Sequence, residues 1–238
     1  MSDAAIWHDL ECGGYDADLP LWRTLAAAAG GPVLDIGAGT GRVALDLARH
    51  GHDVVALDID AGLLAALRAR AGGARVEVIR ADARDFALGR TFPLVLIPMQ
   101  TVQLLPNARE RARLLAGARD HTEIGGLLAI AIADALDGFD ADHSEPPLPD
   151  VREIDGVVYA SRPVRVVDEG DGVTIERLRE VVGLDGSRSE SADVVRLARV
   201  TPDDLEREGV SAGFDVLGRR VVPPTDEYVG SVVVMLRG

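Results

Sequence analysis

The sequence predicts an α/β fold in which a doubly wound, mostly parallel, seven-stranded sheet carries an inserted antiparallel β meander after its fifth strand. Short apolar segments and helical segments alternate between residues 32 and 134, as in parallel sheets with right-handed crossovers. Over residues 151–199 the pattern changes, and apolar and polar residues alternate without helical spacing. The chain has 238 residues, 47% of them apolar, which suits one large domain or one domain with a small insertion.

The first half of the sheet is predicted from short apolar runs that end at polar or glycine residues. The run "PVLDIG" at 32–37 is short and apolar and ends in glycine, as a buried parallel strand does. The segment "TGRVALDLARHG" at 40–51 has an apolar face and a glycine at its end, which predicts a helix. The same reasoning predicts three further strands and one helix, which are strands 52–60, 74–82 and 91–99 and helix 61–73.

The next helix–strand unit follows at residues 107–134. Asn107 and Glu110 have the spacing of a capping box, which predicts the start of a helix. The paired glycines at 125 and 126 predict its end, and "LLAIAIAD" at 127–134 predicts the fifth strand.

The C-terminal part of the chain returns to the sheet. Thr201 as N-cap and Pro202 at the first helical position predict a short helix over 201–209. Two apolar runs, 214–222 and 228–237, predict a closing pair of strands. The acidic, proline-bearing segment 137–150 is too long for an ordinary connection, so we expect it to form a rim or lid.

Charge and composition exclude several classes of function. The formal net charge of −14 disfavours nucleic acid and anionic membranes as partners. All 25 basic residues are arginine, so neither a Schiff-base lysine nor a P-loop lysine is available. Cys12 is the only cysteine, which excludes an internal disulfide and a cysteine-based zinc cluster. We find no His/Asp/Glu spacing of a metal site, no apolar run that spans a membrane and no secretion signal, so we expect no metal and a cytoplasmic location.

The segment "VLDIGAGTG" at 33–41 places glycines between a predicted strand and a predicted helix. This arrangement binds nucleotides in open α/β sheets, although a tight turn that requires positive φ would also explain the glycines. A dinucleotide fingerprint needs G-x-G-x-x-G, but Arg42 stands at the position of its third glycine. Asp35, two residues before Gly37, would disfavour a bound pyrophosphate and favour a cation.

These residues resemble the first motif of the class I S-adenosylmethionine (SAM)-dependent methyltransferases, D/E-x-G-x-G-x-G. The resemblance covers about residues 15–135 and implies a Rossmann-like sheet that binds SAM and releases S-adenosylhomocysteine. It implies that Asp35 lies near the cofactor ammonium and that the loop at Gly37, Ala38 and Gly39 packs against the methionine part. Further implied cofactor contacts lie at later strand ends, where Asp58 would bind the ribose hydroxyls and Asp82 the adenine amino group, with Ile59, Ala83 and Met99 beside them.

Simpler interpretations stay open for several of these residues. Asp58 could be an N-terminal acid of the following helix, although Asp60 fits that capping role better. Asp82 could be a turn residue, and Met99 could pack at a strand end.

The resemblance also implies a division of the chain. Residues 1–30 would form an N-terminal helical cap, 31–136 and 200–238 the SAM-binding domain, and 137–199 a substrate-covering insert. Strand edges of the insert could pair across a dimer, so we expect a monomer or a homodimer.

Catalytic residues are harder to predict, because methyl transfer needs a general base only where the acceptor must lose a proton. Gln100 follows the fourth strand, where relatives carry a substrate-facing polar residue, and Gln103 is spaced to share its face. Leu104 stands where many relatives have histidine, which weakens the case for a histidine base in this motif. Tyr15 and His143 are the other catalytic candidates, followed by His8 and Asp134, while Trp7 and Trp22 could line an acceptor pocket or anchor the cap.

The sequence therefore predicts a SAM-dependent methyltransferase that modifies a nitrogen or oxygen of a small molecule, such as a natural-product intermediate. Two alternatives keep the cofactor: non-methylating chemistry of a cyclase type, and a binding module that senses SAM.

Overall fold

The computed structural model describes residues 2–133, 139–140, 148–225 and 228–238. It contains two β-sheets, as the sequence predicts, and the larger has seven strands in the order β11-β12-β5-β4-β1-β2-β3. Strands β1 to β5 run parallel, while β12 pairs antiparallel with β5 and β11 antiparallel with β12. The strands are β1 Val33–Ile36, β2 Val54–Asp58, β3 Val76–Arg80, β4 Phe92–Ile97, β5 Thr122–Ile132, β11 Asp215–Val222 and β12 Ser231–Arg237.

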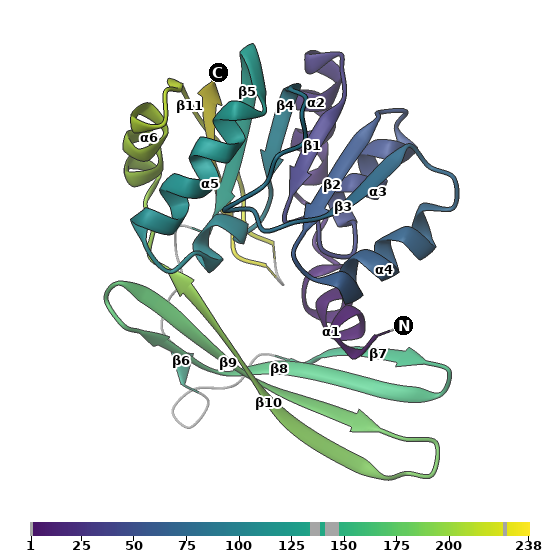
Figure 1. Ribbon diagram of the computed structural model, residues 1–238. Helices are drawn as coiled ribbons and strands as arrows, with labels where there is room; N and C mark the ends of the chain where they lie inside the picture. The colour runs from purple at the N-terminus through teal and green to yellow at the C-terminus, as the bar shows by residue number, and fades with distance from the viewer. Residues whose placement is uncertain (1, 134–138, 141–147, 226–227) are drawn as a thin grey trace.

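Helices cover both faces of this sheet, which makes it doubly wound (Figure 1). On one face α2 (Leu19–Ala29), α3 (Arg42–Arg49) and α4 (Ala61–Ala71) bury apolar side chains against β1, β2 and β4. On the other face α5 (Ala108–Asp120) and α6 (Pro202–Ser211) pack against the alternate side chains of the same strands. The two apolar clusters are separate because successive strand side chains point to opposite faces.

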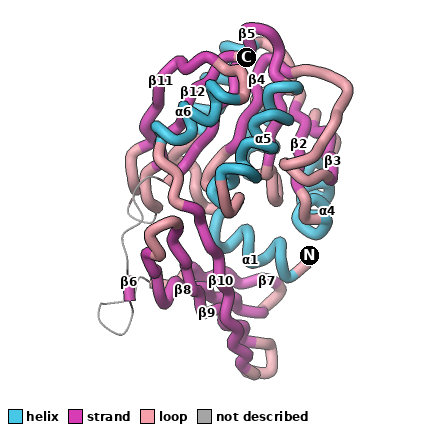
Figure 2. Tube along the Cα trace, turned by 60° about the vertical axis from the view of Figure 1, so that its left-hand side comes forward, coloured by secondary structure: helices cyan, strands magenta, loops and turns pink. Residues whose placement is uncertain are grey.

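The second sheet is the predicted meander. It contains β6 (Phe139–Asp140), β7 (Asp150–Ile154), β8 (Val157–Asp168), β9 (Gly172–Val182) and β10 (Arg188–Ala198), all paired antiparallel. Figures 1 and 2 show this sheet beyond one end of the first, with helix α1 (Asp3–Cys12) between the two. The predicted division into cap, sheet domain and insert stays a prediction, and the predicted lid at 137–150 lies mostly outside the described residues.

The predicted boundary between the helix that starts at Asn107 and the fifth strand was wrong. Helix α5 ends at Asp120 and β5 begins at Thr122, so Gly125 and Gly126 lie inside the strand. His121 ends the helix: its Nδ1 lies 2.7 Å from the carbonyl of Gly117, and its Nε2 accepts the N–H of Leu88 at 2.9 Å. The strand extends because the N–H of Gly125 donates to Gly238 at 2.8 Å.

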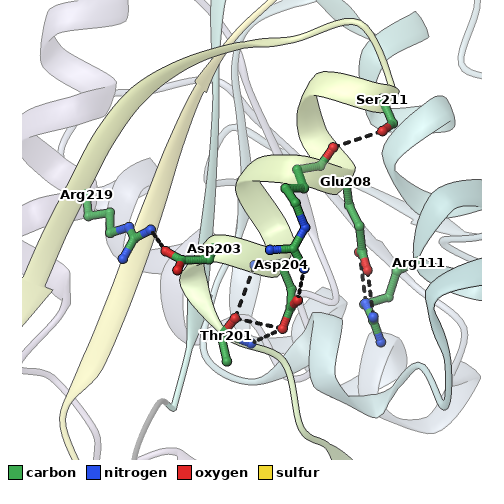
Figure 3. A network of polar contacts seen from close by, with 8 residues as sticks. Arg111, Thr201, Asp203, Asp204, Glu208, Ser211 and Arg219 are labelled. Atoms are coloured by element: carbon green, nitrogen blue, oxygen red, sulfur yellow. Dashed lines mark hydrogen bonds and ion pairs between the residues drawn. The ribbon is translucent and has the colours of Figure 1, made fainter.

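Two helix starts follow the predicted capping chemistry. Asn107 caps α5 by accepting the N–H of Glu110. Thr201 caps α6 in a reciprocal capping box with Asp204, as Figure 3 shows. Figure 3 also shows Glu208 of α6 against Arg111 of α5, whose guanidinium donates to both carboxylate oxygens at 2.6 and 2.9 Å. This pair fixes the last helix on the sheet next to its neighbour.

A buried ion pair joins the N-terminal region to the loop of residues 37–41 between β1 and α3, called the glycine loop below. Asp18 precedes α2 and is 1% exposed, and its carboxylate accepts hydrogen bonds from Arg42 at 2.5 and 2.8 Å. It also accepts the indole N–H of Trp22 at 2.8 Å. Arg42 donates in addition to the carbonyl of Tyr15 at 2.7 Å. The arginine at the position of a third glycine therefore binds the chain that precedes α2.

We expect Asp18→Ala to lower the free energy of unfolding by about 3–5 kcal/mol, because it leaves the buried charge of Arg42 without its partner. Chemical denaturation at pH 7 measures this change. Asp203→Ala is the matched control, because Asp203 pairs with Arg219 at the surface, where an ion pair contributes about 1 kcal/mol or less. Equal losses in the two variants would contradict a structural role for the Asp18–Arg42 pair.

Candidate cofactor and acceptor cavity

A cavity of about 560 Å³ lies between the two sheets. One side is formed by the glycine loop and by the segment that follows β4. Another is formed by helix α1, and a third by side chains of β9 and β10. Ligands of open α/β sheets bind beyond the carboxyl ends of the strands, and this cavity occupies that position.

The glycines of the loop are required by close packing as well as by backbone conformation. Gly37, Gly39 and Gly41 have φ values of 78°, 55° and 95°. A Cβ at Gly37 would lie 2.3 Å from Thr101 Cγ2, and one at Gly41 would lie 2.2 Å from Leu67 Cδ1. Both distances are shorter than a carbon–carbon contact allows. The interpretation of these glycines as a tight turn is thus correct for the backbone. In addition, Gly37 and Ala38 lie on the cavity wall.

Asp35 lies at the carboxyl end of β1 and lines the cavity, with 1% of its surface exposed. Neither carboxylate oxygen has a hydrogen-bond partner of ordinary geometry among the described residues. Burial raises the pKa of Asp35 to about 7, although the nearby Arg42 guanidinium opposes the shift. A cation in the cavity would stabilise the charged carboxylate, as the predicted contact with the cofactor ammonium requires.

Asp58 has a structural role beside its predicted ribose contact. One of its oxygens accepts the N–H of Gly39 at 2.8 Å, and the other accepts the N–H of Asp60 at 2.9 Å. Asp60 itself caps α4 through the N–H groups of Gly62 and Leu63, as the sequence predicted. Asp58 does not line the cavity itself, and ribose binding stays a prediction that the second lone pair of each carboxylate oxygen allows.

Asp82, the residue predicted to bind the adenine amino group, forms an ion pair with Arg84. Asp82 accepts hydrogen bonds from the side chain and the backbone N–H of Arg84, which lowers the pKa of Asp82 to about 2. This geometry is that of a turn residue, and neither Asp82 nor Ala83 lines the cavity. Ile59 is mostly exposed and also lies outside the lining. Adenine contacts by these three residues stay predictions.

The segment after β4 brings two predicted residues to the cavity. Met99 and Gln100 both line it, and Met99 adopts a φ of 54°, which a non-glycine residue rarely does. Gln103 does not share the face of Gln100. Its amide is buried and bonds to the N–H and carbonyl of Ala133 at 2.9 and 3.1 Å, so it connects this segment to β5.

The remaining catalytic candidates receive less support. Tyr15 is buried but does not line the cavity; its ring lies 5.2 Å from that of Tyr228, and the Arg42 guanidinium lies 5.1 Å from its centroid. His143 and Asp134 lie outside the described residues. Trp22 anchors the cap through Asp18, whereas Trp7 lines the cavity.

Sequence reasoning missed the polar wall opposite the glycine loop. Glu11 of α1 accepts hydrogen bonds from the Arg179 guanidinium at 2.8 and 2.9 Å and from Ser161 at 2.7 Å. Burial is the largest single influence and raises the pKa of Glu11, but the hydrogen bonds from Arg179 and Ser161 and the nearby arginine charges together outweigh it, so the net shift is downward. Arg179 also contacts Asp193 of β10 at 2.8 Å. The period-two spacing of cavity residues 175, 177 and 179 is the signal that could have identified one face of β9.

Two further groups on this wall have unused hydrogen-bonding capacity. Arg177 and Asp193 are directly opposite in the β9–β10 register, and both line the cavity. Arg177 Nη1 and Asp193 Oδ2 are buried and have no hydrogen-bond partner in the described part of the chain, and Arg177 Nη1 lies 3.8 Å from the Asp150 carboxylate. Ile175, Val195 and Leu197 add apolar surface around them.

The single cysteine also lies on the cavity wall. Burial raises the pKa of the Cys12 thiol to about 11, so the reactive thiolate is scarce at neutral pH. Within the described ranges, no group of three or more His, Cys, Asp or Glu side chains could hold a metal ion. No helix in the same ranges is long and apolar enough to cross a membrane.

The doubly wound sheet, the glycine loop with its acid, and the cavity at the strand ends define a class I methyltransferase fold. A family model described as "Methyltransferase domain" matches residues 33–126. The cypemycin N-terminal methyltransferase of Streptomyces sp is 30% identical over 144 residues, which cover 56% of this chain and 59% of that protein. These matches show a methyltransferase domain over residues 33–126, in a class I methyltransferase fold.

Solved structures agree over most of the chain. The sugar N-methyltransferase KedS8 from Streptoalloteichus sp has a TM-score of 0.75 and 22% identity, over 100% of this chain and 94% of that one. The SAM complex of the glycopeptide N-methyltransferase MtfA has a TM-score of 0.62 and 26% identity, over 92% and 86% of the two chains. The alignment to the curated cypemycin relative spans less than two thirds of that relative's length.

We expect Asp35→Asn to stabilise the free protein at pH 8 and to weaken SAM binding. The folded pKa of Asp35 is raised, so the folded state holds a proton that the unfolded state has lost above about pH 4, and stability falls as pH rises toward 7. Asn removes that loss, by on the order of 1–3 kcal/mol. Denaturation curves at pH 5 and pH 8 measure it, and the gain in stability of the variant should be larger at pH 8 than at pH 5.

The same carboxyl links SAM binding to proton release. A bound cation lowers the pKa of Asp35, so near pH 7 the wild type should release about half a proton per SAM bound. Calorimetry in two buffers of different ionisation enthalpy counts these protons, and Asp35→Asn should release fewer. Equal proton release by both proteins would exclude Asp35 as the group that senses the cofactor charge.

Proposed function

We propose that the protein is a SAM-dependent methyltransferase that transfers a methyl group to a nitrogen or oxygen of a small molecule, such as a natural-product intermediate. The observation that carries the proposal is Asp35, a buried and unpaired carboxyl beside the glycine loop in a cavity with a second, separate polar wall. The loop side suits a cationic cofactor, and the wall of β9 and β10 suits an acceptor. Relatives named for sugar, glycopeptide and peptide N-terminal methylation support this class of acceptor.

SAM would supply the electrophilic methyl carbon, which forms a bond to the acceptor lone pair while the carbon–sulfur bond breaks and S-adenosylhomocysteine leaves. The protein then mainly positions and desolvates the reactants. Asp35 would face the cofactor ammonium, and the loop at Gly37, Ala38 and Gly39 would hold the methionine part. Gln100, beside Met99, would orient the acceptor from the end of β4.

The acceptor would lie against the second sheet. Arg177 Nη1 offers a hydrogen-bond donor there and Asp193 Oδ2 an acceptor, with Ile175 and Val195 beside them. A proton lost from the acceptor could pass to a carboxylate of this wall or to solvent.

The two alternative functions receive less support from the cavity. A SAM sensor would fit an open cleft with exposed apolar surface better than a cavity covered by α1 and a second sheet. A cyclase-type reaction needs the same cofactor residues, so only the product distinguishes it. A cytoplasmic location, a monomer or homodimer, and the absence of nucleic-acid and membrane partners stay predictions from the sequence.

Calorimetry with SAM and with S-adenosylhomocysteine is the first test. We expect both to bind. The absence of binding heat from either compound at high protein concentration would contradict the proposal. Asp58→Ala should weaken binding by about 1–3 kcal/mol, because it removes acceptors for a buried hydroxyl pair. Asp203→Ala, far out on the surface of α6, is the control and should leave the affinity unchanged.

Transfer itself is tested with amine and hydroxyl acceptors, including amino-sugar nucleotides and short peptides, in the presence of SAM carrying a labelled methyl group. We expect S-adenosylhomocysteine to form with stoichiometric label in one class of acceptor. SAM binding without label transfer to any acceptor would favour the sensor, and an unlabelled, rearranged product would favour cyclase-type chemistry.

A further inference from the structure

Helix α1 places a histidine directly over the glycine loop. His8 lines the cavity, and its ring occupies the space that a side chain at Gly39 would need. A Cβ at Gly39 would lie 2.5 Å from His8 Nε2 and 2.7 Å from His8 Cε1. The edge of this imidazole therefore excludes a side chain at Gly39. The matched methyltransferase domain begins at residue 33, so α1 lies outside it.

A hydrogen-bonded relay fixes the orientation of the ring. His8 Nδ1 lies 3.2 Å from Thr40 Oγ1, and Thr40 is 3% exposed. The Thr40 side chain also interacts with the carboxylate of Asp9, which Arg70 pairs from α4. An ionised carboxylate can only accept, so with Thr40 donating to Asp9 the Thr40 oxygen accepts from His8 Nδ1–H. The relay thereby leaves the lone pair of the imidazole on Nε2.

The surroundings of His8 keep it neutral. Burial lowers its pKa, and this outweighs the opposing charges of Asp9, Asp58 and Glu11; Arg42 adds to the lowering. Nε2 forms no hydrogen bond with the described residues and belongs to a side chain on the cavity wall. A neutral imidazole with a fixed Nδ1–H is a hydrogen-bond acceptor at Nε2, and it requires a donor there.

We propose that His8 Nε2 accepts a hydrogen bond from the α-ammonium of bound SAM, so that helix α1 completes the cofactor site. The inference rests on the proposed function. The amino-acid end of SAM offers one donor group, its ammonium, and the glycine loop beneath His8 is where that end binds in the proposed site. Asp35 would contribute the charge that stabilises this ammonium, and His8 would contribute a directional acceptor from the opposite side of the loop.

Calorimetric titration of His8 variants with S-adenosylhomocysteine tests the inference, because this product keeps the ammonium. His8→Leu removes the acceptor and should raise the dissociation constant about tenfold or more, as expected for one hydrogen bond to a charged group. His8→Gln places an amide oxygen near the position of Nε2 and should recover most of the affinity. Asp3→Ala, an exposed change in the first turn of α1, is the control and should bind like the wild type.

A second probe, 5′-methylthioadenosine, lacks the amino-acid end and so lacks the ammonium. His8→Leu should bind it as tightly as the wild type does. Equal losses for both probes would show that His8 only holds the loop in shape, and no loss for either would show no contact; both results overturn the inference. A wild type that binds neither SAM nor S-adenosylhomocysteine would instead overturn the proposed function itself.

Discussion

The buried contact between Arg42 and Asp18 is the constraint on which the cavity depends. Arg42 begins α3 directly after the glycine loop, and Asp18 directly precedes α2, so one bidentate pair fixes the N-terminal region against the loop. The same guanidinium opposes the upward pKa shift of Asp35. Without this positive charge a buried, unpaired carboxyl at the end of β1 would be more costly. The pair therefore connects the stability of the fold to the charge of the candidate site.

The cavity combines two kinds of wall with different origins. The proposed cofactor side is built from loops that follow the neighbouring parallel strands β4, β1 and β2, which end at one edge of the sheet. The opposite side comes from α1 and from a sheet inserted far along the sequence, and Glu11 with Arg179 joins the two. A common cofactor machinery can thus be combined with an acceptor surface that varies independently, as expected where function is carried by sites added to a shared fold.

Features of the structure that depend on neighbouring residues could be predicted from the sequence, whereas those that depend on distant contacts could not. Helix starts with side-chain caps, such as Asp60 and Thr201, were predictable because capping is local chemistry. The end of α5 was not, because a contact of His121 with Leu88 and the pairing of Gly125 with Gly238 decide it over long sequence distances. Gln103 was misplaced for the same reason, since its partner is Ala133, which follows β5. To predict which residues of β9 line the cavity, one must know the strand register. The alternation of polar and apolar residues does not supply it.

The single thiol of the chain lies on the inner side of α1, between the two walls. It is partly exposed toward the cavity, and burial is the main cause of its raised pKa. A molecule that fills the cavity would therefore cover this thiol as well. The rate at which a small thiol reagent modifies Cys12 should fall as the cavity becomes occupied, so the chain carries its own reporter of occupancy without an engineered label.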